Sequence, residues 1–157
     1  MHKRNTEEAF LWIVNILKNH KIPFQITGGL AAKVYGSKRK LADIDIDSSK
    51  KYFKILMPEI KNYIKAGPNR YRDKNWDLYS ITLKYKGQVI DLCGIENTKI
   101  FDCNTRKWVK LRSDISKAVK RKIYGVNVLI QSKDELVAYK KKLGRKVDRT
   151  DVRQIEN

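Results

Sequence analysis

The segment from Ile26 to Asp47 constrains this chain more than any other, because a glycine pair precedes a run of alternating acidic residues and isoleucines. Asp43 and Asp45 are two residues apart, so in a strand both project from one face while Ile44 projects from the other. Carboxylates held side by side repel one another, and burying them costs free energy that a divalent cation can offset. The acidic run therefore predicts a metal site on one face of a strand.

The glycine pair, Gly28-Gly29, follows a short apolar run and precedes a helix-compatible stretch. Glycine at a strand-to-helix turn lets backbone N–H groups come close to phosphate oxygens. Together with the acidic run, this turn predicts a site for a metal-bound nucleotide.

Length and composition are those of one globular domain. The chain has 157 residues, of which 41% are hydrophobic and 33% charged, so we expect a soluble protein with a single core. The apolar run Phe10–Val14 is too short to span a bilayer, and the N-terminus lacks the charged-then-apolar order of a signal peptide. We therefore expect a cytoplasmic protein without a membrane partner.

Cysteine and histidine usage argues against zinc or a disulfide framework. Cys93 and Cys103 are the two cysteines, and they form no CxxC pair. His2 and His20 have no partner nearby in sequence at the spacing of a zinc site.

The chain is strongly basic, with a net charge of +18, and the charge is unevenly spread. Residues 106–157 alone hold 16 basic and 6 acidic side chains, a net charge of +10. Such a surface attracts polyanions and steers them in from solution. Nucleic-acid contact and a solubility surface are both compatible with this charge.

Periodicity predicts alternating helices and strands in the first half of the chain. We expect helices over 6–19, with an apolar stripe at i, i+3, i+4 and i+7, and over 30–35, ended by Gly36. A further helix is expected from Ser48 or Ser49 to about residue 57, interrupted or restarted by Pro58 and continuing to residue 65, and Gly67-Pro68-Asn69 indicates a break. Alternation predicts strands over 24–27, 44–47, 77–85 and 88–92, with a hairpin turn at Lys86-Gly87.

The second half is less regular. We expect a loop over 94–106, a short strand over 108–111, a weak helix over 113–120 and a turn with a strand over 124–130. Ser132 and Glu135 form a capping box that opens a helix ending at Gly144, and a last helix begins at residue 148 or 150.

A third carboxylate, Asp91, interrupts the apolar run Val-Ile-Asp-Leu-Cys on a second predicted strand. Three carboxylates facing one cleft suit Mg²⁺, which takes the rest of its shell from water and substrate phosphates. Two bridged ions can activate an attacking oxygen and stabilise a departing one. The sequence has no GxxxxGK[ST], GxGxxG, GxSxG or HExxH motif, which disfavours the enzyme classes built on them.

These motifs resemble the signature of the DNA polymerase β-like nucleotidyltransferases. Thr27-Gly28-Gly29 is followed by a thirteen-residue spacer, then Asp43-Ile-Asp45, then Asp91, and Arg39 matches an arginine frequent in the small members. The run from Ser132 to Asp151 is similar to a segment of the antibiotic-type and toxin-type members. The resemblance covers residues 22–95 and 130–155.

The resemblance implies an α+β fold in which a small mixed β-sheet is flanked by helices, with a short helical C-terminal segment. We expect one nucleotidyltransferase domain over 1–157, with the catalytic core at about 22–95 and a basic, mainly helical part at about 113–157.

The resemblance also implies a role for each matched residue. The expected reaction moves an NMP from an NTP, with ATP as the expected nucleotide, onto an acceptor hydroxyl and releases pyrophosphate. Two Mg²⁺ ions are expected. The implied catalytic and metal-binding residues are Asp43, Asp45 and Asp91, with Asp91 also helping to deprotonate the acceptor, and the implied nucleotide-binding residues are Gly28, Gly29, Arg39 and Lys140.

Several residues have a second interpretation. Asp47 continues the acidic alternation, yet the end of a strand more often faces solvent or caps the next helix. Lys140 lies among Lys141 and Lys142, so it belongs either to a phosphate contact or to a solvated basic face. Arg145, Asp148 and Asp151 fit a salt-bridged helix junction as well as a site, and Trp76 fits packing better than base stacking.

The acceptor is open between two classes. The basic surface mildly favours RNA such as tRNA, while the small size also fits a small molecule. A different class of function, a catalytically inactive nucleic-acid-binding module that kept the fold, is disfavoured because an unused carboxylate cluster costs stability through repulsion.

Overall fold

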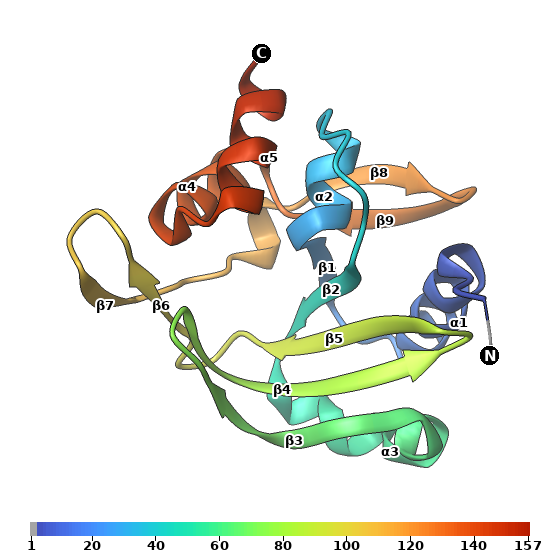
Figure 1. Cartoon of the computed structure of the whole chain (residues 1–157). Coiled ribbons are helices and arrows are strands. Elements are labelled where there is room, and N and C mark those ends of the chain that lie inside the picture. The colour runs from blue at the N-terminus through green and yellow to red at the C-terminus, as the bar shows by residue number, and fades with distance from the viewer. Residues whose placement is uncertain (1–2) are drawn as a thin grey trace.

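The computed structural model describes residues 3–157, so His2 lies outside it. Nine strands form one mixed sheet with helices on both faces (Figure 1). The strand order is β7-β6-β4-β5-β2-β1-β9-β8, and β3 pairs with the outer side of β4. The strands are β1 Phe24–Thr27, β2 Asp43–Ser48, β3 Ile64–Arg72, β4 Trp76–Tyr85, β5 Gln88–Gly94, β6 Lys99–Asp102, β7 Lys107–Lys110, β8 Val119–Ile123 and β9 Val126–Ile130.

The helices begin and end where the local sequence provides caps. In α1, the Asn5 side chain accepts a hydrogen bond from the Glu8 N–H at 3.0 Å, and in α4 Ser132 does the same for Glu135 at 3.3 Å. Gly144 ends α4 in the left-handed conformation at φ 61°. The helices are α1 Thr6–Asn19, α2 Gly28–Val34, α3 Phe53–Ile60, α4 Lys133–Leu143 and α5 Lys146–Glu156. None of these helices, within the described residues, is long and apolar enough to cross a bilayer.

The main core lies between one face of the sheet and helices α1 and α3. Ile44 and Ile46 of β2 are fully buried there, against the predicted stripe of α1 that contains Phe10 and Leu17. Each such side chain contributes about 1.5–3 kcal/mol through burial. The isoleucines thereby fix which face of β2 carries Asp43, Asp45 and Asp47: the face turned away from this core.

A second, smaller apolar cluster joins α2, α4 and α5 on the side of the sheet where the aspartates lie. Its buried members include Ala31 of α2, Leu136 and Tyr139 of α4, and Ile155 of α5. In Figure 1 these three helices stand together next to the ends of β1 and β2. The acidic face of β2 is therefore bordered by helices and is not an open surface.

Three strands depart from the sequence predictions. The predicted break at Gly67-Pro68 lies inside β3, which is a strand because it is an edge strand with an irregular register between Ala66 and Asn69. The predicted loop 94–106 contains β6. The predicted helix over 113–120 is wrong, since Ile115–Lys117 is a 3₁₀ turn and β8 begins at Val119.

The predicted helix over 48–65 is also shorter than expected. A 3₁₀ turn over Lys50–Tyr52 precedes α3, which includes Pro58 and ends at Ile60. The predicted mainly helical part, 113–157, contains the β8–β9 hairpin as well as α4 and α5.

Candidate functional site

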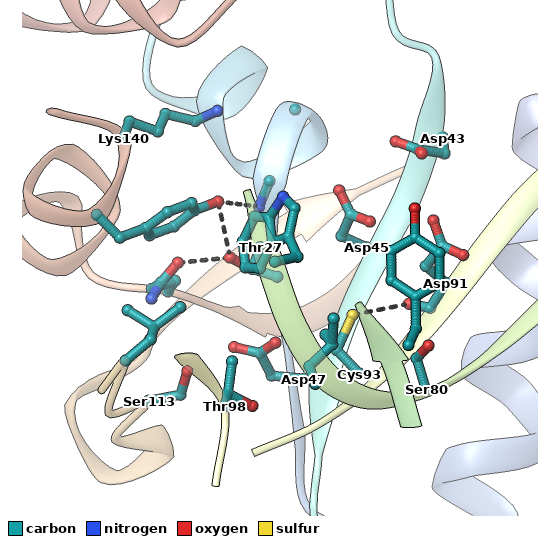
Figure 2. A pocket seen from close by; sticks show the side chains of 18 of the residues that line it. Thr27, Asp43, Asp45, Asp47, Ser80, Asp91, Cys93, Thr98, Ser113 and Lys140 are labelled. Carbon is teal, nitrogen blue, oxygen red and sulfur yellow. Dashed lines mark hydrogen bonds between the residues drawn. The ribbon is translucent and has the colours of Figure 1, made fainter. Parts of the chain in front are cut away.

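The structure brings the three predicted carboxylates together. Asp43 and Asp45 project from β2, and Asp91 projects from the neighbouring parallel strand β5, directly beside Asp45. One ligand atom of each carboxylate lies within 4.8 Å of the others (Figure 2). The prediction that two separate strands contribute to one acidic cluster matches this geometry.

The cluster is electrostatically strained as it stands. Burial raises the pKa of Asp45 well above its usual value, and the charges of Asp43 and Asp91 raise it further. Burial is also the main reason that the pKa of Asp91 rises to about 6. Within residues 3–157 the ion pairs involve other carboxylates, so no lysine or arginine neutralises this trio directly. A hard divalent cation with oxygen ligands fits such a donor set.

Thr82 orients one of the three carboxylates. Its hydroxyl donates to Asp91 Oδ1 at 2.7 Å from the adjacent strand β4, where Thr82 and Asp91 are register partners. The sequence prediction did not include Thr82. The tight turn at Lys86-Gly87 contains the missing signal, because a two-residue hairpin turn fixes which residue of β4 opposes Asp91.

The glycine turn abuts this cluster, and Gly28 has to be glycine for two reasons. Its φ is +62°, and a Cβ added there would lie 2.1 Å from Asp45 Oδ2. Gly29 is adjacent to the guanidinium of Arg39, since a Cβ on Gly29 would lie 3.1 Å from Arg39 Nη2. The predicted nucleotide-binding residues Gly28, Gly29 and Arg39 therefore lie together beside Asp45.

Tyr139 of α4 is a contact that the sequence prediction missed. Its hydroxyl accepts a hydrogen bond from the Gly28 N–H at 3.1 Å and lies 3.4 Å from the Thr27 hydroxyl. Thr27 in turn donates to the side chain of Gln131. These bonds attach α4 to the glycine turn across more than a hundred residues of sequence, so no local pattern announces them.

Arg39 and Lys140 take part in a buried ion network rather than projecting freely. Arg39 donates two hydrogen bonds to Asp151, at 3.0 and 2.9 Å. Lys140 Nζ lies 3.2 Å from Asp148 and 3.0 Å from Asp151, and the residue is 2% exposed. Arg145 completes the network on Asp148. Lys140 is thus not on the solvated face of α4, and the helix-junction interpretation of Asp148 and Asp151 is confirmed.

A cavity of about 530 Å³ extends from the acidic trio along the same face of the sheet. Its wall near α4 includes Trp76, whose ring lies 6.1 Å from the Tyr139 ring in an edge-to-face contact and 6.0 Å from the Arg145 guanidinium. At the far end the walls are polar and comprise Asp47, Cys93, Thr98 and Ser113 (Figure 2).

The prediction for Asp47 is wrong, because this residue neither faces solvent nor caps a helix. Asp47 is 8% exposed and lines the cavity, and its Oδ2 accepts a hydrogen bond from Gln25 Nε2 at 3.0 Å. Burial raises its pKa to about 6 despite the Gln25 hydrogen bond and a weaker contribution from Ser113. The sequence prediction failed because it could not foresee that Gln25, its partner on β1, and the loop at Ser113 would cover the end of β2.

Comparison with known proteins identifies the fold. No protein-family profile and no curated protein matches the sequence. Among solved structures, a Thermotoga maritima protein described as a candidate nucleotidyltransferase (TM1012) matches with a TM-score of 0.70 and 19% identity over 97% of this chain and 94% of its own. The lincosamide antibiotic adenylyltransferase LnuA, with lincomycin bound, matches with a TM-score of 0.67 and 15% identity over 99% of both chains.

A further match is ANT(2″)-Ia in complex with adenylyl-2″-tobramycin, with a TM-score of 0.61 and 12% identity over 95% of this chain and 86% of the other. The chain therefore has the nucleotidyltransferase fold over nearly its whole length, which confirms the predicted fold class and the predicted resemblance at the level of the fold. At these identities the reaction has to be argued from the site itself.

Proposed function

We propose that this protein is a metal-dependent nucleotidyltransferase that moves an NMP from an NTP to an acceptor hydroxyl. A bond forms between the acceptor oxygen and the α-phosphorus, while the bond from that phosphorus to the bridging oxygen of the β-phosphate breaks. The bond's electron pair leaves with pyrophosphate, and the acceptor proton passes to a carboxylate and then to solvent. The single observation that carries the proposal is the convergence of Asp43, Asp45 and Asp91 within 4.8 Å beside the glycine turn.

The trio is well suited to hold the metal ions. Its oxygen donors, burial and uncompensated charge favour divalent cations such as Mg²⁺, with Asp43 and Asp45 as shared ligands and Asp91 completing the second position. When bound, the ions would supply charge stabilisation for the attacking and departing oxygens. Thr82 holds Asp91 in place, and Asp91 would accept the proton of the acceptor.

The glycine turn and its neighbours would hold the triphosphate, as the predicted roles of Gly28, Gly29, Arg39 and Lys140 require. Arg39 and Lys140 already bind Asp148 and Asp151, so we assign them a positive field near the phosphates and a structural role, in which they fix α4 and α5 against the turn. ATP remains the proposed donor, on the strength of the resemblance and of the two adenylyl-transferring fold neighbours.

The acceptor has two candidate classes. The net charge of +18 supports an RNA such as tRNA, because a basic surface attracts a polyanion. The enclosed cavity beside the trio supports a small molecule, because only a compact group reaches its polar end.

The experiment that tests the proposal uses α-phosphate-labelled NTPs with Mg²⁺, total cellular RNA and a panel of small hydroxyl compounds. We expect labelled product and released pyrophosphate from the wild type, and a loss of at least about a thousandfold in Asp45→Asn. Thermal melting provides a control that needs no turnover, because Mg²⁺ or Mn²⁺ should raise the melting temperature of the wild type and not of Asp45→Asn. A folded wild type that neither binds metal at the trio nor releases pyrophosphate with any acceptor would overturn the assignment.

A further inference from the structure

We propose that Asp47 is the residue that selects the acceptor, and that the polar end of the cavity around it binds an amino group of a small hydroxyl-bearing molecule. This inference rests on the proposed nucleotidyl transfer and adds the substrate class to it. It favours the small-molecule acceptor over RNA.

Asp47 differs from the other deeply buried aspartates of this chain in having no cationic partner. Asp148 and Asp151 are both fully buried, and Lys140, together with Arg145 or Arg39, forms ion pairs with them. Asp47 is also buried, yet its neighbour is the neutral amide of Gln25, and within residues 3–157 no lysine, arginine or histidine lies within ion-pair distance of it. A buried carboxylate is costly without a partner, so a ligand that brings a positive charge would be bound strongly there.

The Gln25 side chain indicates that Asp47 acts as a hydrogen-bond acceptor in the folded protein. Gln25 is fully buried and turns its amide donor toward Asp47 Oδ2, while its own Oε1 is the one buried side-chain oxygen without a partner among the described residues. Leaving that oxygen unpaired costs free energy. The arrangement therefore holds the Asp47 carboxylate in a fixed position at the wall of the cavity.

Asp47 is not a fourth ligand of the proposed metal cluster. It follows Asp45 by two residues in a strand, which separates their Cα atoms by about 7 Å. The group of carboxylates that converges on one point consists of Asp43, Asp45 and Asp91 without Asp47. The register places Asp47 in a separate row beside Cys93 of β5, whereas Asp45 is beside Asp91.

The position of Asp47 relative to the glycine turn points to the acceptor rather than to the triphosphate. Along the paired strands β1 and β2, Thr27 opposes Asp45 and Gln25 opposes Asp47, so the turn at Gly28 and the Asp47 end lie on opposite sides of the Asp45–Asp91 row. In an in-line displacement the entering oxygen approaches opposite the leaving group. If the leaving pyrophosphate lies at the glycine turn, the acceptor enters from the side of Asp47.

The local charge of the cavity opposes the charge of the whole molecule. Five aspartates line it, and the three basic residues that line it are all ion-paired to Asp148 or Asp151. The charges of bound metal ions and of a triphosphate offset each other, which leaves Asp47 as an unbalanced charge at the far end. The neutral hydroxyls of Thr98 and Ser113 nearby suit a ligand that carries hydroxyl as well as amino groups.

The experiment compares acceptors that differ only in the charge of one amino group. The probes are amino sugars and amino alcohols, each paired with its neutral N-acetyl derivative, together with a short RNA that ends in a free 3′ hydroxyl. With labelled NTP and Mg²⁺, we expect the wild type to label the amines in preference to their N-acetyl partners by at least about 30-fold in kcat/KM. Equal labelling within the pairs, or labelling of RNA alone, would overturn the inference even if Asp47 could not be substituted.

The variant Asp47→Asn removes the charge and keeps an oxygen for Gln25. We expect it to lose the preference for the amines while it still labels the neutral partners. Asp102→Asn is the matched control, because Asp102 is 6% exposed, similarly buried, and does not line the cavity. A changed preference among NTPs with an unchanged preference among acceptors would show that Asp47 reads the nucleobase, and would overturn the inference. The absence of pyrophosphate release with every acceptor would instead overturn the proposed transfer itself.

Discussion

Gly28 and Asp45 occupy space that neither could share with a larger neighbour. A Cβ on Gly28 would lie 2.1 Å from Asp45 Oδ2, and the φ of +62° is unfavourable for any other residue. The glycine thus serves the carboxylate at least as much as it serves a phosphate. This contact explains physically why a glycine and an Asp-x-Asp run occur together in one chain.

Replacing Gly28 by alanine tests that contact. We expect Gly28→Ala to displace Asp45, to abolish the stabilisation by added Mg²⁺ and to abolish transfer. Gly125→Ala is the matched control, because Gly125 has a φ of +79° but a Cβ added there would meet no atom within 4 Å. Both variants should lose about 1–2 kcal/mol of unfolding free energy from the backbone alone. Metal-dependent melting that is retained in Gly28→Ala would contradict the prediction.

At the residue scale, the sequence predicted the acidic trio because each member interrupts a regular apolar pattern. Asp91 stands out in Val-Ile-Asp-Leu-Cys, and Asp43 and Asp45 alternate with isoleucines. The contacts of Tyr139 could not be predicted in the same way, since its partner Gly28 is 111 residues away. Long-range packing creates such contacts, and single-sequence patterns contain no record of it.

Helices α4 and α5 form one unit with the glycine turn, and charge rather than apolar area joins them. Lys140 of α4 lies between Asp148 and Asp151 of α5, and Asp151 also binds Arg39 next to Gly29. A buried network of this kind is costly to break on one side, because the remaining charges stay buried without a partner.

Two adjacent lysines of α4 separate the structural effect of charge from its general effect. Lys140→Met should lower the free energy of unfolding by about 3 kcal/mol, because Asp148 and Asp151 would lose a shared cation. Lys141→Met removes the same charge one residue later, where Lys141 is 56% exposed and pairs with Glu156 at the surface. That variant should stay within about 0.5 kcal/mol of the wild type in urea unfolding. Similar losses in the two variants would refute the buried role of Lys140.

The docking of α5 should also depend on acid pH. Burial by itself would raise the pKa of Asp151, but hydrogen bonds from Arg39, Ser37 and Lys140 outweigh it and lower the pKa to about 2, from 3.8. A depressed carboxylate pKa contributes stability that is present above pH 3.8 and is lost as the pH falls through about 2. We therefore expect Asp151→Asn, which is less stable at pH 7, to lose less stability than the wild type between pH 4 and pH 2. Parallel urea-unfolding curves for the two proteins over that range would argue against it.

At the element scale, the sequence predicted the elements whose signals are local and failed where the sheet edge overrides them. The caps at Asn5 and Ser132 and the alternation of β4 identified α1, α4 and β4. Strands β3 and β8 have compositions atypical of strands, Gly67-Pro68 in one and Lys120-Arg-Lys122 in the other. Both lie at edges, where proline and charge are tolerated and even protect against edge-to-edge pairing.

The whole molecule separates two electrostatic environments. The chain carries a net charge of +18, while the cavity is lined by five aspartates and by basic residues that are already ion-paired. A polyanion is attracted over long distances to the surface, but a group that enters the cavity meets carboxylates at close range. Binding of RNA and choice of acceptor are therefore separable properties of this protein.

Charge reversal on β8 tests that separation. Lys120, Arg121 and Lys122 are exposed on this edge strand and line no part of the cavity. We expect the triple change to glutamate to weaken RNA binding and to reduce its dependence on salt, since each phosphate contact contributes about 0.7 to the slope of log K against log salt for single strands. Transfer to an amine-bearing small acceptor should stay unchanged, whereas Asp45→Asn should abolish transfer and leave RNA binding intact.

The opposite pattern would favour a catalytically inactive binding module. If the β8 reversal removed the protein's function in the cell while Asp45→Asn left it untouched, the acidic trio would be a relic of the fold. The burial of Asp45 beside Asp43 and Asp91 argues against that outcome, because repulsion among them destabilises the folded chain when no cation is bound. In the absence of metal, an unused trio predicts that Asp45→Asn is more stable than the wild type, and a used one predicts in addition that Mg²⁺ reverses this order. Unfolding of both proteins with EDTA and with Mg²⁺ distinguishes the two cases.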